Sequence, residues 1–426
     1  MEEKREQTER TEQASPCAAV LETAAPAEAG AKKLRVLVAM DVYLPNVDGV
    51  VNVMRNHLLH FPDWVEATAV GPKAKYYTDT DPYPIIRYKG FHVPFLKTVD
   101  FGFPSRDKAF LQRVREMDLD IIHVHTPFGV CKALTKLARE KGIPIVATFH
   151  TNYRMVFKHI FWLPFIYEPY IRTLGRRYGR MDEMFAATGA TEAQLRSFGY
   201  KGSCSIVPFG TSLKEPEDRM QYVRRANELY GLREDETVFC FVGRLVKSKR
   251  VQFTLKALRI VRDRGYSFKF LVGGIGNYER ALRRKIKKLG LSDCVVMTGF
   301  LESEGLKTVY SRADLQLFPS ILDNFALVKV EAATFCTPGL YLRGSNTAYG
   351  TTDMRNAILA ENRVEDFADK IEWALTHPRE LAEIGQHAHD ELYFSWEDAA
   401  AMQAKEYLRV IREYRQKHAA DGAEKG

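Results

Sequence analysis

Two carboxylates that lie eight residues apart form the most specific chemical pattern of the sequence. Asp323 follows an apolar run that ends at Ser320, and Glu331 lies further along the same segment. If a helix begins near Asn324, both carboxylates face one groove. Carboxylates accept paired hydrogen bonds from vicinal hydroxyls, such as those of a ribose or a pyranose. The pattern predicts a site for such a ligand, and its structural alternative is an N-cap Asp followed by a solvated Glu.

The start of the same predicted helix indicates an anion site. A helix that begins near Asn324 leaves the backbone amides of Phe325, Ala326 and Leu327 unpaired. Unpaired amides at a helix start bind phosphate. We therefore expect the segment from Asp323 to Leu327 to hold both a phosphate and a hydroxylated group.

A glycine and two cations follow another apolar run, in the segment FVGRLVKSKR. Gly243 lets the chain turn, and Arg244 and Lys249 project beyond the run. Two fixed cations there would neutralise a leaving diphosphate and remove the need for a divalent metal. The alternative is a solvated basic surface. The later run VGGIGN resembles a phosphate loop but lacks the full G-x-G-x-x-G spacing, so it is weak evidence.

Three polar segments follow apolar runs in the first half of the chain: MDVYLPNVDGVV, HVHTP and TFHTNY. In the first, Gly49 lets backbone amides approach an anion, although an ordinary turn before a helix near Asn52 has the same composition. His123 and His125 share one strand face, and His150 follows the next run. Both a metal pair and hydrogen-bonded structural histidines explain this pattern, but no third carboxylate or Cys stands nearby in the sequence.

The segments between these motifs predict an α/β fold. Short β-branched runs alternate with segments of helical period from Leu34 onward, which is typical of parallel sheets covered by helices. The alternation lapses from Ser212 to Glu236, which we interpret as a linker. We expect a disordered tail at 1–33, doubly wound Rossmann-like domains at 34–213 and 214–390, and a C-terminal helix at 391–426 that crosses back to the first domain. Ligands of such sheets lie beyond the carboxyl ends of the strands, where the motifs above are placed.

Composition excludes several classes of protein. The 426 residues are 46% apolar, which is ample for two cores, and the most apolar segment, Met155 to Ile171, is interrupted by charges and prolines. The six cysteines are dispersed without CxxC spacing, which favours a reducing, cytoplasmic location. The net charge of +8 favours anionic partners, but the basic residues are spread over both halves and form no nucleic-acid recognition module.

The order and spacing of the motifs resemble those of retaining glycosyltransferases of family 4, which have the GT-B fold of two Rossmann-like domains that face each other across a cleft. The likeness runs from about Arg35 to Tyr414. It rests on the GVV loop, HVHTP, TFHTNY, VPFGT, FVGRLVKSK, VGGIGN, MTGF and the acid-x7-acid block. The resemblance implies a nucleoside diphosphate sugar as donor, bound by the C-terminal domain, and no metal cofactor.

The resemblance also implies a role for each matching residue. Arg244 and Lys249 would hold the diphosphate, Glu331 the ribose hydroxyls and Asp323 a hydroxyl of the transferred sugar. From the N-terminal domain, Gly49 would approach the diphosphate and His150 the sugar. The implied catalytic set is His150, Arg244, Lys249 and Asp323, and the implied donor-binding set is Gly49, Gly243, Arg244, Lys249, Asp323, Asn324, Phe325, Ala326, Leu327 and Glu331.

Several positions depart from the family pattern. Asp323 stands where Glu is usual, Ala326 where Gly is common, and Phe335 with Cys336 replaces an Ala-x-Gly step. Further along, Tyr349 replaces an acid, and Met354 and Ala357 replace glycines. These departures bear on the identity of the sugar more than on the phosphate-binding residues, which are intact.

The acceptor is the least determined part of the reaction. The GVV and TFHTNY motifs are most similar to the branch that glycosylates diacylglycerol and related lipids. Aromatics between Phe157 and Tyr170, Trp162 among them, are interleaved and followed by the cationic side chains Lys158, His159, Arg172, Arg176, Arg177 and Arg180. We therefore expect a peripheral enzyme on an anionic membrane, moving a hexose from a UDP-sugar to a lipid. Two functional alternatives remain: an enzyme with a soluble sugar acceptor, and a catalytically weak protein that only binds nucleotide sugar or membrane. The structural alternative is that the aromatics are buried in the core.

Overall fold

The computed structural model describes residues 32–46, 48–74, 77–92, 100–161, 163–321 and 323–423. The expected tail at 1–33 lies outside the described residues except for its last two positions, and Trp162 also lies outside them. The described chain forms two compact units. One runs from Gly210 to Ser395, and the other combines the residues up to Phe209 with those from Trp396 onward.

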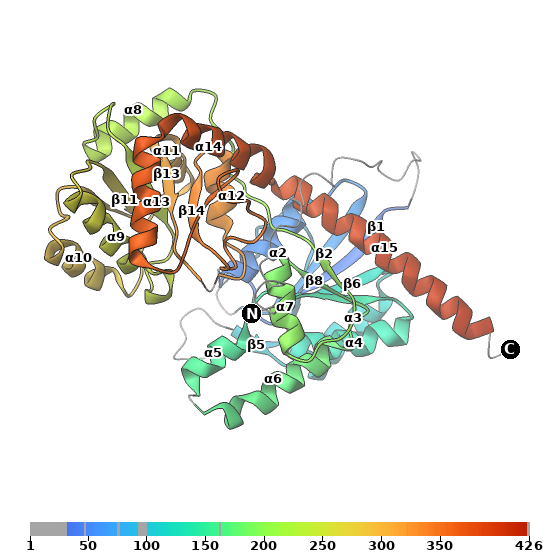
Figure 1. Ribbon diagram of the computed structural model, residues 1–426. Coiled ribbons are helices and arrows are strands. Elements are labelled where there is room, and N and C mark those ends of the chain that lie inside the picture. The colour runs from blue at the N-terminus through green and yellow to red at the C-terminus, as the bar shows by residue number, and fades with distance from the viewer. Residues whose placement is uncertain are drawn as a thin grey trace. The chain divides into compact units, whose positions relative to one another are not determined.

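The N-terminal unit is built on a parallel sheet with the strand order β3-β2-β1-β6-β7-β8-β9 within the described residues (Figure 1). Continuous apolar runs form these strands because both faces of the sheet are covered by helices. A small antiparallel pair, β4 (Gly90–His92) and β5 (Asp100–Gly102), lies apart and was not expected. The parallel strands are β1 (Leu34–Ala39), β2 (Val65–Pro72), β3 (Ile85–Tyr88), β6 (Ile121–Val124), β7 (Ile145–Thr148), β8 (Glu183–Ala186) and β9 (Cys204–Ile206).

Two groups of helices cover this sheet. On one face a core cluster joins the strands to α3 (Lys108–Glu116), α4 (Gly129–Lys141), α6 (Pro164–Tyr178) and α7 (Gly189–Ser197). On the other face a second cluster joins them to α2 (Gly49–His60) and α15 (Trp396–Ala423). The chain therefore returns to this unit through its last helix. A short helix, α5 (Tyr153–Ile160), precedes α6, and a 3-10 turn, η3 (Pro104–Arg106), precedes α3.

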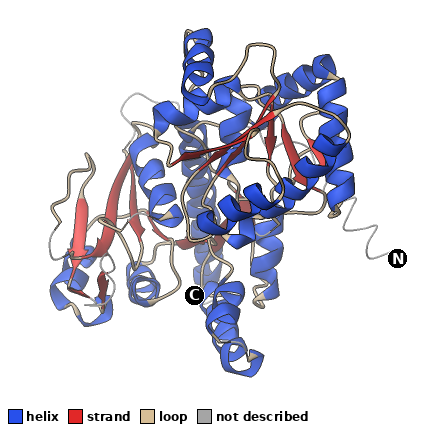
Figure 2. Ribbon diagram, turned by 90° about the vertical axis from the view of Figure 1, so that its left-hand side faces the viewer, coloured by secondary structure: helices blue, strands red, loops and turns tan. Residues whose placement is uncertain are grey.

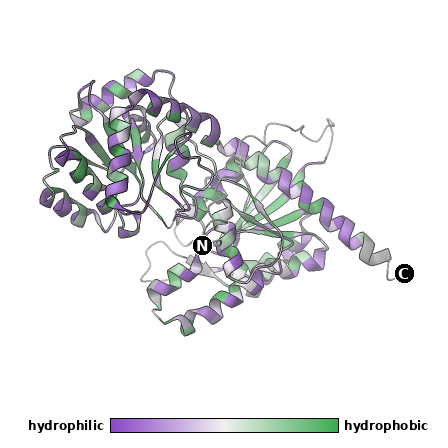
Figure 3. Cartoon of the chain, in the orientation of Figure 1, coloured by the Kyte–Doolittle hydropathy of each residue, from purple (hydrophilic) through white to green (hydrophobic). Residues whose placement is uncertain are grey.

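The unit from Gly210 to Ser395 has a second parallel sheet, ordered β12-β11-β10-β13-β14-β15. Alternation along β10 shows why it needs helices on both faces: Phe239 and Phe241 pack into one core cluster, whereas Val238, Cys240 and Val242 pack into the other. The strands are β10 (Val238–Val242), β11 (Lys269–Gly273), β12 (Val295–Gly299), β13 (Leu315–Leu317), β14 (Gly339–Leu342) and β15 (Ile358–Ala360). In Figure 3 the strands carry the apolar colour.

Helices cover both faces of this sheet, as they do in the first unit (Figure 2). On one side lie α9 (Val251–Asp263), α10 (Glu279–Lys288) and α13 (Val364–Thr376), and on the other lie α8 (Arg219–Tyr230), α11 (Ser303–Arg312) and α12 (Leu327–Thr334). Helix α14 (Pro378–Leu392) contacts α12 and α13 and adds Leu381 and Ile384 to the first core cluster. A 3-10 turn, η4 (Lys247–Lys249), leads into α9.

The α/β prediction is confirmed, and some local predictions are wrong. The segment interpreted as a linker, Ser212 to Glu236, contains α8. This helix packs against α11 through few apolar residues, so its polar sequence did not indicate a helix. The helix expected near Asn324 begins at Leu327. No helix of the described residues has the length and apolarity that a membrane crossing requires.

Candidate active site

The strand order places the predicted donor residues at one point of the second sheet. The chain leaves β10 toward β11 on one side and reaches β13 on the other, and ligands of doubly wound sheets bind at such a switch, beyond the carboxyl ends of the strands. Gly243 and Arg244 directly follow β10, Lys249 ends the 3-10 turn η4 that comes next, and Asp323 follows β13. The two motifs, which are far apart in sequence, therefore meet at one sheet edge.

Glycines allow the backbones of the loops after β10 and β11 to lie in close contact. The amide of Gly243 donates to the carbonyl of Gly273 at 3.0 Å, and Gly243 has a φ of 151°. A Cβ on Gly274 would lie 2.0 Å from the Gly243 oxygen, and one on Gly276 would lie 2.3 Å from the Leu245 oxygen. The glycines of VGGIGN thus have a packing role that explains their presence without a bound phosphate.

Lys249 and Asp323 contact each other directly. Their side chains form an ion pair and are only 17% and 16% exposed. The Lys249 ammonium also lies 5.1 Å from the centre of the Phe318 ring. The second oxygen of Asp323, Oδ2, is buried and has no hydrogen-bond partner among the described residues. A buried acceptor without a partner is costly, so this oxygen is well suited to accept a ligand hydroxyl.

Arg244 differs from Lys249 because its side chain has no polar partner among the described residues. Its side chain is exposed and forms no hydrogen bond or ion pair with the rest of the described chain. It follows Gly243 at the end of β10. A cation in that state can turn toward an anionic ligand without breaking an existing contact.

The start of α12 presents open amides, but later in the chain than the sequence predicted. Helix α12 begins at Leu327, with Ala326 as an N-cap that has no side-chain hydrogen bond. Asp323, which could have capped an earlier start, is instead paired with Lys249. Asn324 and Phe325 therefore precede the helix, and the uncapped amides belong to its first turn from Leu327.

Glu331 is held by a polar network inside this unit. Tyr310 Oη donates to Glu331 Oε2 at 3.3 Å, Gln316 Nε2 donates to Tyr310 Oη at 3.4 Å, and Tyr341 Oη donates to Gln316 Oε1 at 3.2 Å. Burial raises the pKa of Glu331 to about 7, against which the Tyr310 hydrogen bond acts. Sequence reasoning missed Tyr310 and Gln316, although a glutamine inside the apolar strand LQL was an available signal.

Gly49 opens helix α2 in the other unit. Asp48 caps that helix by accepting from the amides of Val50 and Val51 at 2.8 and 2.9 Å, so the helix starts three residues before the expected Asn52. A Cβ built on Gly49 would meet nothing within 4 Å. The internal structure therefore does not require a glycine here.

The histidines at the ends of β6 and β7 are hydrogen-bonded to one another and to the core. His123 is buried, with Nδ1 2.6 Å from Tyr407 Oη and Nε2 2.8 Å from Thr148 Oγ1. His125 Nδ1 lies 2.7 Å from His150 Nε2. These bonds favour the structural interpretation of His123. The described residues include no group of three or more His, Cys, Asp or Glu arranged to hold a metal ion.

His150 is an uncharged group at neutral pH. Burial lowers its pKa to about 3, with a smaller contribution from His57. Its ring stacks on Phe209 at 5.6 Å. A neutral imidazole can exchange hydrogen bonds with a sugar hydroxyl, but it cannot supply positive charge to a leaving group.

Asp41 is a buried carboxylate that the sequence analysis did not single out. Its side chain accepts from Thr126 Oγ1 at 2.6 Å and from the amide of Val130 at 2.8 Å, so it connects the loop after β1 to the start of α4. Burial raises its pKa. The acid directly after the first strand, in MDVY, was the signal available in the sequence.

Two family models match the chain, one in each half. The model described as Glycosyltransferase Family 4 matches residues 47–215, and the model described as Glycosyl transferases group 1 matches residues 224–391. The chain belongs to glycosyltransferase family 4. It is a glycosyltransferase, and the family predicted from the motifs is confirmed.

Curated relatives of this glycosyltransferase include enzymes with lipid and soluble acceptors in their names. It is 24% identical to the alpha-monoglucosyldiacylglycerol synthase of Streptococcus pneumoniae over 72% of this chain and 70% of that protein. The synthase of the same name from Acholeplasma laidlawii is also 24% identical, over 72% and 79%. D-inositol 3-phosphate glycosyltransferase 2 of Catenulispora acidiphila is 29% identical over 70% and 72%.

Solved structures agree on the fold. HepE of Anabaena, in complex with UDP and glucose, has a TM-score of 0.66 at 15% identity and covers 88% of this chain and 99% of that chain. Sucrose-phosphate synthase of Thermosynechococcus elongatus has a TM-score of 0.67 at 18% identity and covers 91% and 100%. At these identities the likeness shows the fold, and the GT-B prediction is confirmed.

Proposed function

We propose that this glycosyltransferase moves a hexose from a UDP-sugar to a membrane lipid such as diacylglycerol, with retention of configuration and without a metal ion. The arrangement that carries the proposal is the meeting of Lys249, Asp323 and the uncapped start of α12 at the switch point of the second sheet. Lys249 and the open amides suit a diphosphate, and the free oxygen of Asp323 suits a sugar hydroxyl.

Each donor residue has a defined part in this proposal. Arg244 and Lys249 neutralise the departing diphosphate, which is the chemistry that a metal ion would otherwise supply. Glu331 accepts hydrogen bonds from the ribose hydroxyls once it is ionised. For Gly49 and His150, which belong to the other unit, we propose contacts to the diphosphate and to the sugar, respectively.

The proposed retention of configuration depends on which group takes the proton of the acceptor hydroxyl. Asp41, the carboxylate directly after β1, already accepts hydrogen bonds from Thr126 and Val130, and His150 is hydrogen-bonded to His125. We propose that the leaving diphosphate itself takes the acceptor proton on the face from which it departs. Attack on that same face gives retention.

A membrane acceptor is supported by the surface of α5 and α6. Phe161, Phe165, Ile166 and Tyr170 are 42%, 72%, 47% and 39% exposed, and exposed apolar side chains beside cations suit an anionic leaflet. Tyr167 is buried, so the core interpretation holds for part of the segment. The names of the two diacylglycerol-glucosylating relatives support the same acceptor class.

A soluble acceptor is the second candidate, supported by the name of the inositol phosphate relative. Purified protein incubated with a panel of UDP- and GDP-sugars separates the candidates. We expect UDP release that rises when diacylglycerol in vesicles of phosphatidylcholine and phosphatidylglycerol is added. Full turnover with soluble glycosides and no lipid would replace the lipid acceptor, and the absence of any diphosphate release with either acceptor class would contradict the transferase proposal.

The membrane surface has its own test. Phe165→Ser with Ile166→Ser removes two exposed apolar side chains at the start of α6 without disturbing the core. We expect weaker co-sedimentation with the same vesicles and unchanged UDP binding. The exposed pair Met220→Ser with Leu229→Ser on α8 is the matched control. Equal co-sedimentation of both variants would reject this surface.

A further inference from the structure

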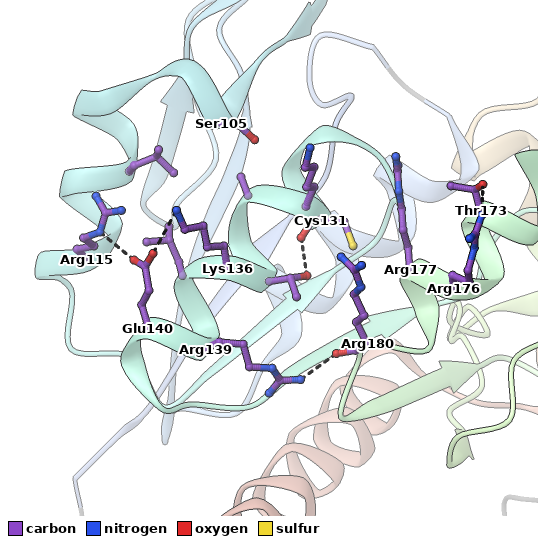
Figure 4. A pocket seen from close by; sticks show the side chains of 15 residues that line it. Ser105, Arg115, Cys131, Lys136, Arg139, Glu140, Thr173, Arg176, Arg177 and Arg180 are labelled. Atoms are coloured by element: carbon purple, nitrogen blue, oxygen red, sulfur yellow. Dashed lines mark hydrogen bonds and ion pairs between the residues drawn. The ribbon is translucent and has the colours of Figure 1, made fainter.

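A basic groove lies on the N-terminal unit. It has a volume of about 1030 Å³ and runs between α4 and the C-terminal part of α6, with α3 at one end (Figure 4). These helices cover the sheet face opposite to α15. None of the described residues that line the groove is one of the predicted donor residues or belongs to the unit from Gly210 to Ser395.

Two matching stripes form the walls of the groove. On α4, Lys132, Thr135, Lys136 and Arg139 follow the i, i+3, i+4, i+7 spacing that places side chains on one helix face. The same spacing recurs on the segment of α6 and the turn after it, with Thr173, Arg176, Arg177 and Arg180. The two basic faces are thus directed into one groove.

Only part of this charge is neutralised inside the protein. Glu140 pairs with Arg115 at 3.1 Å and with Lys136 at 3.7 Å, and Asp182 pairs with Arg139 at 2.9 Å. Four lining cations have no carboxylate partner among the described residues: Lys132, Arg176, Arg177 and Arg180. Like charges held together in a concave surface attract an anion because the surrounding protein focuses their field.

Cations of both helices line the same groove. Figure 4 shows Arg177 and Arg180 extending from the α6 side along α4 near Cys131. Burial raises the pKa of Cys131 to about 12, while Arg177 and Arg180 act on it in the opposite direction, as nearby cations do. Arg177 is fixed by donating to the carbonyl of Pro127 at 2.7 Å.

We propose that this groove binds a phosphate ester, through the arginines of α6 and of the turn after it on one side and Lys132 of α4 on the other. Guanidinium groups match the oxygens of a phosphate in paired hydrogen bonds, and Lys132 adds a point charge. The same phosphate chemistry is present in the headgroup of an anionic phospholipid and in a free phosphomonoester, so the experiment separates these two sources.

The test uses two exposed cations, Lys132 and Arg180, whose side chains form no hydrogen bond or ion pair within the described residues. Lys132→Ala with Arg180→Ala removes two charges from the groove, and Lys287→Ala with Lys288→Ala removes two exposed charges from α10 as the matched control. Binding of glycerol 3-phosphate is measured by calorimetry on full-length protein saturated with UDP, which occupies the donor site. A second arm measures co-sedimentation with phosphatidylcholine vesicles that contain about 30% phosphatidylglycerol, chosen to give a strongly anionic surface.

We expect the groove variant to weaken binding at least tenfold in one of these arms, and the α10 variant to bind like the wild type. Loss in the glycerol 3-phosphate arm identifies a free ester as sufficient, and loss in the vesicle arm alone identifies the lipid headgroup. Arg177→Lys with Arg180→Lys keeps the charge but loses the paired geometry, so intermediate binding is expected. Equal binding by both alanine variants, or no binding of either probe to the wild type, would overturn the proposal.

Discussion

Lys249 and Asp323 form an ion pair that connects the loop after β10 to the loop after β13. The pair explains why helix α12 begins late, because Asp323 is used to hold a cation instead of capping the helix. It also leaves Lys249 already fixed where a diphosphate is expected. The proposed donor chemistry therefore depends on a cation that is positioned before the substrate arrives.

Replacing this cation should be far more costly for catalysis than for folding. We expect Lys249→Ala to lower the transfer rate roughly 100-fold or more, because the departing diphosphate loses a fixed positive charge. Arg244→Ala should show a similar loss without a change in melting temperature. Lys247→Ala, an exposed residue of the same 3-10 turn, is the control and should be near normal. Near-normal turnover of the Lys249 and Arg244 variants would falsify the diphosphate assignment.

Nucleotide affinity should depend on pH through Glu331. Burial raises its pKa to about 7, so the carboxyl is largely protonated at pH 6 and ionised at pH 8. Because the ionised form accepts both ribose hydroxyls, UDP affinity should rise as pH increases through about 7 and then level off. Glu331→Gln should bind more weakly and lose this dependence. A wild-type affinity that is flat from pH 6 to pH 8 would show that Glu331 does not contact the ribose.

Glu331 also makes the free energy of unfolding depend on pH. Its pKa in the folded protein lies above its ordinary value of 4.5, so the folded state holds the proton more tightly than the unfolded state. This contribution is fully present below pH 4.5 and is lost as pH rises through about 7. The wild type should therefore lose stability relative to Glu331→Gln over that window in denaturant titrations.

Gly49→Ala tests whether a ligand, not the fold, requires the glycine. A methyl group at this position would meet nothing within 4 Å, so the melting temperature should stay the same or rise slightly. If the diphosphate approaches this backbone, the added carbon should raise the KM for the donor, and Gly49→Ser should raise it further. Unchanged donor kinetics in both variants would remove Gly49 from the site.

How far the sequence determines this fold is clear from particular strands. Strands β10 (Val238–Val242) and β14 (Gly339–Leu342) are buried throughout, and their residues form the unbroken apolar runs from which the sequence predicts buried parallel strands. The charged helix α8 was missed because it buries little, with Ala226 as its fully buried residue among those described. Local pattern thus predicts the interior better than the periphery.

The candidate site was predictable where it depends on local order and unpredictable where it depends on distant partners. Arg244, Lys249 and Asp323 could be placed because each follows a strand. The network from Tyr310 through Gln316 to Glu331 joins separate elements, and His123 bonds to Tyr407, which lies 284 residues away. Sequence spacing carries no signal for such contacts.

Two departures from the family pattern retain the backbone that a glycine would favour. Cys336 has a φ of 51° and Met354 a φ of 57°, both in the left-handed region. We expect Cys336→Gly to raise the free energy of unfolding by about 0.5–1 kcal/mol, because the strain of the Cβ outweighs the added chain entropy. Cys336→Ala removes the thiol but keeps the Cβ, so it should not stabilise. Equal stability of both variants in urea titrations would contradict this explanation.

The hydrogen bond between Tyr407 and His123 should hold α15 on its sheet. Both side chains are fully buried, and the Tyr407 hydroxyl lies 2.6 Å from His123 Nδ1. Tyr407→Phe leaves that nitrogen without a partner in the core, so we expect a loss of about 1–3 kcal/mol in the free energy of unfolding. Amide hydrogen exchange should rise along α15. Tyr167→Phe, which removes a hydroxyl from a buried residue of α6 that has no hydrogen bond within the described chain, is the control. If both variants melt like the wild type, α15 is held by its apolar contacts alone, through residues such as Val410 and Ile411.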